Sequence, residues 1–271
     1  KIDVTKDNVS IRGNGNATIL KRMYNSSVDE GVITLTSRSR CKIANLQVDG
    51  NRSSYTKIYN HGIYLSGSSN NTITGNTCNN NSSGIYLSSS SNNNNVTGNT
   101  CNNNRPSSGI RVHTSSNNNN VTGNTCNNNS RGIYLSGSSN NTITGNTCNN
   151  NNQGIDFYAS SNNTATGNAC NNNDSGIYLS DSSNNPVTGN TCNNNNQGII
   201  LGNSRNNTVT GNACIRGTGL AADYTSGQYT ILIGGTDNSY NLISNNNCMG
   251  KAVTNEGGTG NTLVYNKYNA T

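Results

Sequence analysis

A phrase of about 22 residues recurs along most of this chain of 271 residues. It begins with GIYL or a close variant at Gly62, Gly84, Gly109, Gly132, Gly154, Gly176 and Gly198, at intervals of 22, 25, 23, 22, 22 and 22 residues. Near-identity at a fixed period of this length is typical of solenoids, in which each repeat is one coil of a stack. The repeat therefore constrains the fold more than any other feature.

Each repeat reads as three very short strands separated by polar turns. In G-I-Y-L the Ile and Leu point inward on either side of an outward residue, in T-I-T-G the Ile points inward, and in T-C the Cys does. Strands this short bury a core only when coils stack about 4.8 Å apart. We therefore predict an all-β fold, a right-handed parallel β-helix of about 10 coils with three short strands in each.

Stacking turns equivalent residues into columns along the molecule. Ile63, Ile85 and Ile110 begin one inward column, and Leu65, Leu87 and Val112 begin another. Stacked side-chain amides can hydrogen-bond along such a column, as they do in other stacked strands. The predicted asparagine column contains Asn76, Asn99, Asn124, Asn146, Asn168, Asn190 and Asn212.

We expect residues 1–271 to form a single β-helix domain with three regions. Irregular coils occupy 1–61, regular repeats of 22–25 residues occupy 62–214, and an insertion and closing coils occupy 215–271. In the last coil Tyr265 replaces the usual glycine and Tyr268 the usual cysteine. Two bulky residues at this turn predict a plug over the end of the core.

The charge distribution argues against nucleic acid as a partner. The net charge of +6 comes mostly from the first sixty residues, and the repeats carry too few basic residues to line a groove. No stretch approaches the 18 apolar residues or so that a membrane span needs. The chain begins at Lys1 without a signal peptide, which suggests a processed or excised form of a secreted or cell-surface protein.

Nine cysteines could suggest disulfides or a metal site, but their positions favour another interpretation. Seven hold one inward position on successive coils, where parallel Cβ directions aim the sulfur atoms poorly at one another. We expect buried thiols that act as small hydrophobic residues, with no metal and no cofactor. Some stacked disulfides remain an alternative, and Cys41, at a turn, is expected to be exposed. The column contains Cys78, Cys101, Cys126, Cys148, Cys170, Cys192 and Cys214.

The repeat resembles known β-helix families. The phrase GI-x-L…N-x-x-I-x-x-N resembles repeats of the NosD-like and carbohydrate-binding/sugar-hydrolase families, and NVSIRGNGNATIL resembles the first coils of pectate-lyase-like and mannuronan-epimerase-like proteins. The resemblance covers nearly the whole chain and implies the fold. It implies no single activity, because these families include lyases, hydrolases, epimerases, tailspikes and non-enzymatic surface proteins. The NosD name is linked to copper-site maturation, but no Cys-His or Met cluster supports copper here.

Aromatic and charged residues follow the inward Ile on successive coils and could bind a polysaccharide. Tyrosine rings would contact sugar faces, and charges would contact hydroxyl or carboxylate groups; alternatively, Tyr simply suits an exposed strand. The candidate ligand-binding residues are Tyr64, Tyr86, Arg111, Tyr134, Asp156, Tyr158, Asp174 and Tyr178.

A charged cluster within this row could act as an acid/base site. If the protein is an enzyme, the candidate catalytic residues are Arg111, His113, Arg131 and Asp156. An epimerase-type Asp-Pro-His segment is missing, as are the paired carboxylates that a hydrolase needs. Ordinary drift among repeats is the alternative explanation.

Three functions follow from these patterns. The leading hypothesis is a structural or glycan-binding module without catalysis, which could also self-assemble, because near-identical coils give a long uniform surface. The second is a polysaccharide lyase, hydrolase or uronate epimerase that uses the Tyr/Arg/Asp face. The third is ice binding through the outward threonines of the T-x-T strands, which include Thr74, Thr97, Thr122, Thr144, Thr166, Thr188 and Thr210.

Overall fold

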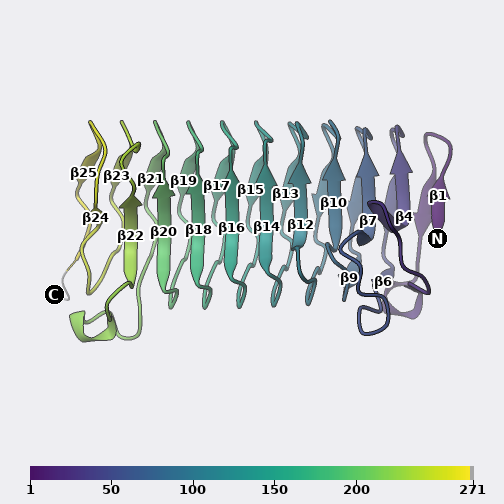
Figure 1. Ribbon diagram of the computed structural model, residues 1–271, viewed down its shortest axis with the longest axis horizontal. Coiled ribbons are helices and arrows are strands. Elements are labelled where there is room, and N and C mark those ends of the chain that lie inside the picture. Colours follow the sequence, from purple (N-terminus) through teal and green to yellow (C-terminus); the bar gives the residue numbers. More distant parts are fainter. Residues whose placement is uncertain (269–271) are drawn as a thin grey trace.

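The chain winds into a right-handed parallel β-helix, as predicted, in a computed structural model that describes residues 1–268 apart from the side chain of Asn16. Sheets A and B hold 11 parallel strands each, and sheet C holds three (Figure 1). Neighbouring strands come from successive coils, so each coil contributes one strand to sheet A and one to sheet B. Two short 3-10 turns, η1 (Gly15–Ala17) and η2 (Ala221–Asp223), interrupt the pattern.

Strand bounds follow the repeat closely. Sheet A contains β1 (Ile2–Val4), β4 (Glu30–Thr36), β7 (Asn60–Ser66), β10 (Ile85–Ser88), β12 (Ser108–His113), β14 (Arg131–Ser136), β16 (Gln153–Tyr158), β18 (Ser175–Ser180), β20 (Gln197–Gly202), β22 (Tyr229–Gly234) and β24 (Thr254–Asn255). Sheet B contains β2 (Ser10–Arg12), β5 (Lys42–Ala44), β8 (Thr72–Thr74), β11 (Asn95–Thr97), β13 (Asn120–Thr122), β15 (Thr142–Thr144), β17 (Thr164–Thr166), β19 (Pro186–Thr188), β21 (Thr208–Thr210), β23 (Leu242–Ser244) and β25 (Thr262–Val264). Sheet C contains β3 (Ile19–Lys21), β6 (Gln47–Asp49) and β9 (Thr77–Asn79).

The predicted third strand is regular only in the first coils. Beyond β9, the T-C segments pair through single bridges such as Thr77 to Thr100 and Thr100 to Thr125. In these segments the chain turns two residues after the Cys, at a left-handed asparagine such as Asn103. The third side of the solenoid is therefore a column of turns rather than a long sheet.

The inward columns have the predicted register. Ile85 pairs with Ile63 on one side and with Ile110 on the other, and the residues two positions on pair in the same way. Residues in these columns are fully buried and form one continuous core. Apolar burial of this kind is the main stabilising contribution in a stack of coils.

Three asparagine ladders run through the corners, where the sequence predicted one. In the predicted ladder, the Asn99 side-chain amide donates to the carbonyl of Ile73 at 2.9 Å and to Asn124 Oδ1 at 3.1 Å. Its own oxygen accepts from the backbone N–H of Asn76 at 3.0 Å. Equivalent ladders include Asn71 with Asn94 and Asn81 with Asn104. Buried amides are tolerated here because neighbouring coils satisfy them.

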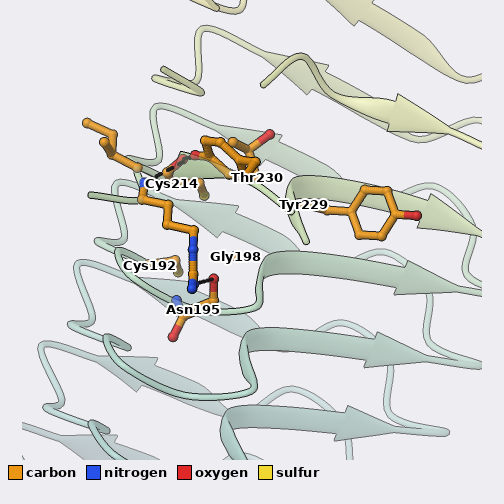
Figure 2. Close-up of a pocket in the computed structure, with 9 residues that line it drawn as sticks. Cys192, Asn195, Gly198, Cys214, Tyr229 and Thr230 are labelled. Carbon is orange, nitrogen blue, oxygen red and sulfur yellow. Dashed lines mark hydrogen bonds between the residues drawn. The ribbon is translucent and has the colours of Figure 1, made fainter. Parts of the chain in front are cut away.

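All nine cysteines are buried free thiols. Figure 2 shows Cys192 and Cys214 on successive coils of the column. Burial raises the pKa of thiols such as Cys101. The predicted exposure of Cys41 is wrong, because Cys41 is 3% exposed at the corner before β5. It takes the place that Asn71 takes in the next coil, and its backbone N–H donates to Asn71 Oδ1 at 2.9 Å.

The C-terminal insertion covers the side of the last complete coils. Arg216 donates to the carbonyl of Asn195 at 3.1 Å, and the Tyr224 hydroxyl donates to the carbonyl of Met249 at 3.0 Å. The predicted tyrosine plug is wrong for Tyr265, which is 86% exposed, because it takes the outward glycine position with a φ of 55°. Tyr268 does pack against the core. Within residues 1–268, no helix is long and apolar enough to cross a membrane.

Candidate functional site

The outward row of sheet A is continuous in space. Tyr64 pairs with Tyr86, Tyr86 with Arg111, and Arg111 with Tyr134. The row goes on through Asp156 to Tyr178. One side chain therefore extends from each coil, along the face that Figure 1 shows as a row of long arrows.

The start of this row is covered rather than exposed. Tyr64 and Tyr86 are 9% and 3% exposed, so the expectation that the whole row is exposed is wrong for these two residues. The Tyr64 and Tyr86 rings lie 5.2 Å apart, and the His61 ring meets Tyr86 edge-on at 4.8 Å. The long loops before β4 and β7 bring Asp29, Ile58 and Tyr59 to the same place.

These loops and the row enclose an open hollow of about 350 Å³, here called hollow 1. Two of the predicted catalytic residues, Arg111 and His113, lie on its wall together with Tyr86. Its lining residues are Asp29, Ile58, Tyr59, Ser82, Tyr86, Pro106, Ser107, Arg111 and His113.

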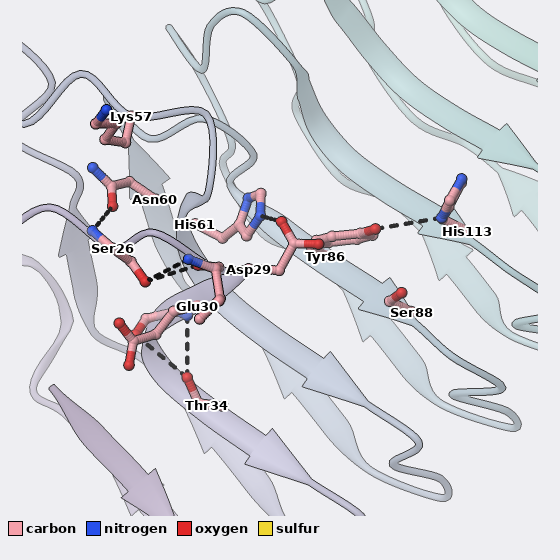
Figure 3. A network of polar contacts seen from close by, with 12 residues as sticks. Ser26, Asp29, Glu30, Thr34, Lys57, Asn60, His61, Tyr86, Ser88 and His113 are labelled. Atoms are coloured by element: carbon pink, nitrogen blue, oxygen red, sulfur yellow. Dashed lines mark hydrogen bonds and ion pairs between the residues drawn. The ribbon is translucent and has the colours of Figure 1, made fainter.

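A histidine that the sequence reasoning missed lies behind hollow 1. His61 Nε2 is hydrogen-bonded to Asp29 Oδ1 at 3.0 Å (Figure 3). Burial lowers the pKa of His61 although Asp29 opposes this, and the hydrogen bond from His61 lowers the pKa of Asp29. The buried Arg22 side chain donates to the carbonyl of His61 at 2.8 Å and holds this part of the chain in place. A buried imidazole behind the wall of hollow 1 therefore holds the Asp29 carboxylate, which lines the hollow.

A second histidine lies on the other side of Tyr86. The Tyr86 hydroxyl lies 3.4 Å from His113 Nδ1 (Figure 3). Burial raises the pKa of Tyr86, and burial together with Arg111 lowers the pKa of His113. The Arg111 guanidinium lies 4.8 Å from the centre of the Tyr86 ring, within the range of a cation–π contact. Hollow 1 thus combines a phenol, an imidazole, a carboxylate and a guanidinium.

Hollow 2 lies further along the same face and measures about 400 Å³. Its charged residues are Arg131 and Asp156, whose Nε and Oδ2 atoms lie 2.7 Å apart. Burial raises the pKa of Asp156 to about 6, and the attraction of Arg131 opposes this rise. Asp156 is therefore mainly ionised at neutral pH and pairs with Arg131. The lining residues are Arg131, Tyr134, Gln153, Asp156, Tyr158, Tyr178 and Ser180.

Tyr134 joins the two hollows. The Arg111 guanidinium lies 5.8 Å and the Arg131 guanidinium 4.4 Å from the centre of its ring. The polar face therefore runs without a break from β10 to β18, parallel to the axis of the solenoid.

The structure brings most of the predicted site residues together. Arg111 and His113 line hollow 1, while Arg131, Tyr134, Asp156, Tyr158 and Tyr178 line hollow 2. Tyr64 is buried beneath the start of the row, and Asp174 lines neither hollow. The exposed Asp174 carboxylate accepts from the Asn196 side chain at 3.2 Å. Asp29 and His61 were missed because they lie outside the regular repeats, and the available signal was that His61 is one of only two histidines.

Solved structures with a similar fold come from several kinds of protein. The A-module of the mannuronan C-5 epimerase AlgE6 of Azotobacter vinelandii aligns with a TM-score of 0.77 at 15% identity, over 98% of this chain and 81% of that one. The periplasmic alginate epimerase AlgG aligns with a TM-score of 0.63 at 19% identity, over 87% of this chain and 60% of its own. The Dettilon tailspike protein aligns with a TM-score of 0.61 at 16% identity, over 94% and 60%.

Likeness at this level of identity shows the shared fold alone. Among curated proteins, none matches the sequence. The sequence does match the family described as "Periplasmic copper-binding protein (NosD)", over residues 1–131 and again over residues 129–271. These two matches cover the whole chain, which therefore belongs to the NosD family of parallel β-helix proteins.

Proposed function

We propose that this protein binds a polysaccharide along the outward face of sheet A, between β10 and β18, without chemical change to the ligand. The supporting observation is the continuous row of Tyr86, Arg111, Tyr134, Asp156 and Tyr178 on successive strands. The half-buried rings of Tyr134 and Tyr178 are already held in place, so little side-chain entropy is lost on binding.

The similar structures are consistent with this proposal. Two are named as epimerases of mannuronan or alginate, and both present a β-helix of the same kind. The family description and the AlgG title both refer to periplasmic proteins. We therefore place the proposed binding in the periplasm or outside the cell, where burial would protect the free thiols from exchange.

The family description also mentions copper, which the residues of this chain do not fit. Within residues 1–268, no group of three or more His, Cys, Asp or Glu side chains is arranged to hold a metal ion. The thiols of the column are buried one per coil, and the rings of His61 and His113 both contact Tyr86, which lies between them. The proposed binding therefore involves no copper step.

A glycan array followed by titration calorimetry tests the proposal. Tyr134→Ala should lower the affinity for the bound polysaccharide about tenfold, because it removes the ring that joins the two hollows. Tyr240→Ala is the matched control, since Tyr240 is an exposed tyrosine at the corner before β23. Equal affinity of the Tyr134→Ala variant and the parent protein would refute the proposal. Sedimentation of the same samples shows whether the chain also self-assembles.

One observation favours an enzyme as a second candidate. In hollow 1 the Tyr86 hydroxyl, His113 and Arg111 lie together, as a lyase or epimerase of uronates would require. Arg111 would bind the sugar carboxylate, and Tyr86 or His113 would take the proton from the carbon next to that carboxylate. In an epimerase a second proton, from water in the open hollow, would then add to that carbon from the opposite face. In a lyase the bond to the leaving sugar oxygen would break to give an unsaturated end, and that oxygen would take up a proton from the protonated base.

Incubation with uronate polymers separates the two candidates. New ultraviolet absorption from unsaturated ends, or inverted C5 centres in the proton NMR spectrum, would establish catalysis. Loss of that signal in His113→Asn, with the parent melting temperature retained, would assign it to hollow 1. Unchanged polymers after long incubation would leave binding as the function.

A further inference from the structure

The two hollows differ in how their arginine is paired. Arg111 carries a positive charge that has no ion-pair partner among residues 1–268, and its buried Nε atom has no hydrogen-bond partner. Asp29, the carboxylate of the same hollow, is hydrogen-bonded to His61. The guanidinium is held between the Tyr86 and Tyr134 rings, at 4.8 Å and 5.8 Å from their centres. An unpaired, pre-oriented guanidinium is suited to one carboxylate.

Hollow 2 offers no such free cation. Arg131 is already paired with Asp156 at 2.7 Å, and the Asp156 side chain is 6% exposed. The remaining walls are the rings of Tyr134, Tyr158 and Tyr178, with Gln153 and Ser180 as uncharged hydrogen-bonding groups. A neutral sugar fits this lining, because its ring can pack on tyrosine and its hydroxyls can bond to amide and carboxylate. A second carboxylate would lose its hydration here without gaining a cation.

The spacing of the strands places the carboxylate site at Arg111 and the neutral-sugar site in hollow 2 within reach of one polymer. Arg111 lies on β12 and Asp156 on β16, with only β14 between them. Two coil steps amount to about 10 Å along the axis. An extended chain of linked pyranose rings advances by a similar distance over two residues, so three consecutive sugars would lie at Arg111, Tyr134 and Asp156.

Resting on the proposed polysaccharide binding, we propose that the ligand is a sparsely charged heteropolysaccharide, with one acidic sugar bound at Arg111 followed by neutral sugars at Tyr134 and in hollow 2. The Arg131–Asp156 pair is then the specificity determinant that disfavours polymers with a carboxylate on every sugar. This preference separates the chain from a protein built for homopolymeric uronates.

Titration calorimetry with three matched probes tests the specificity. The probes are fragments of gellan, a linear polymer whose repeat holds a single glucuronate among neutral sugars, the same fragments after carboxyl reduction, and polygalacturonate fragments of equal length. We expect gellan fragments to bind at least tenfold more tightly than either of the other two probes. Reduced gellan lacks the carboxylate that Arg111 would bind, and polygalacturonate lacks the neutral sugar that hollow 2 would bind.

The Asp156→Asn variant gives the sharpest result. Removal of the carboxylate frees Arg131, so the affinity for polygalacturonate relative to that for gellan should rise about tenfold. Asp174→Asn is the matched control, since Asp174 is an exposed carboxylate that precedes β18 and lines neither hollow; it should change neither affinity.

Four results would count against the specificity or against the proposed function. Equal binding of gellan and polygalacturonate by the parent protein, or an equal change for both polymers in Asp156→Asn, overturns the specificity while polysaccharide binding stands. Binding of polygalacturonate without gellan does the same. Failure of every glycan on the array to bind overturns the proposed function itself.

Discussion

Sheets A and B are made by the same coils, yet their outward faces differ. From β8 to β21 the outward residues of sheet B are all Thr, Asn or Pro. Over the same coils, the central outward position of sheet A changes from Tyr to Arg, Asp and Ile. Both faces rest on the same buried columns, so variation on sheet A alters no core contact. Residues that depart from the repeat on an outward face are therefore the ones to examine for function.

The largest expected effect is a loss of stability on disruption of an asparagine ladder, a feature that supports both faces. Asn124→Ala removes a buried amide that accepts from Asn99 and donates to the carbonyl of Val96 and to Asn146 Oδ1. Unsatisfied groups remain in both neighbouring coils, and we expect a loss of about 3 kcal/mol in the free energy of unfolding, measured by urea denaturation. Asn128→Gly, at an exposed left-handed turn of the same coil, should cost under about 0.5 kcal/mol, because glycine tolerates the φ of 59°. Similar midpoints for the two variants would show that the ladder is not a main source of stability.

The next effect is a pH-dependent change in the free energy of unfolding, caused by one carboxylate on sheet A. The Asp156 pKa of about 6 lies above its usual value, so the folded protein binds this proton more tightly than the unfolded chain does. Asp156 therefore destabilises the fold above pH 6, and this cost disappears as the pH falls towards 4. The groups that face it are Arg131 and Tyr134 on β14, Tyr178 on β18, and Gln153 and Tyr158 on its own strand.

Asp156→Asn should accordingly be more stable than the parent protein by about 2 kcal/mol at pH 7.5, with a difference near zero at pH 4. Urea midpoints of both proteins across this range measure the difference, and titration of all other groups cancels. A difference that grows as the pH falls would contradict the assigned cause.

A smaller effect compares the two faces within one coil. Tyr178→Ala should weaken polysaccharide binding about fivefold, because Tyr178 forms one wall of hollow 2. Thr188→Ala changes the outward face of sheet B in the same coil and should leave the affinity within about twofold. Equal losses in both variants would mean that the ligand contacts both faces or neither.

The smallest expected effect is on thermal hysteresis, which tests whether sheet B binds ice. Asn95, Asn120 and Pro186 interrupt one threonine column, and the hydroxyls of Thr97 and Thr122 donate to the neighbouring asparagines. Since these hydroxyls are not free to match an ice lattice, we expect no thermal hysteresis at millimolar protein. Hysteresis that Thr144→Ala abolishes would instead assign ice binding to this face.

Sequence reasoning was strongest where the period could be read directly. The inward columns of Ile85 and Leu87 follow from alternation and spacing alone, because one coil sets the register of the next. The second and third asparagine ladders were missed because corner residues have no alternation to mark them as inward. Cys41 was misjudged for the same reason, since it occupies a ladder position without being an asparagine.

The site was only partly predictable. Tyr134 and Asp156 pair on neighbouring strands, so the register alone places them together before any coordinates are known. Asp29 and His61 meet through loops of irregular length, whose paths no period describes. The burial of Tyr86 depends on the same loops, so an outward strand position could not reveal it.

The fixed register has a consequence for how such a chain can change over generations. Gly132, Gly154, Gly176 and Gly198 are each 22 residues apart, and every coil bonds only to the coils on either side. Loss or duplication of residues 176–197 in the gene would rejoin matching strands and ladders without a new interface. The length of the molecule can therefore drift in whole-coil steps, while the four coils between Tyr86 and Asp156 keep their spacing.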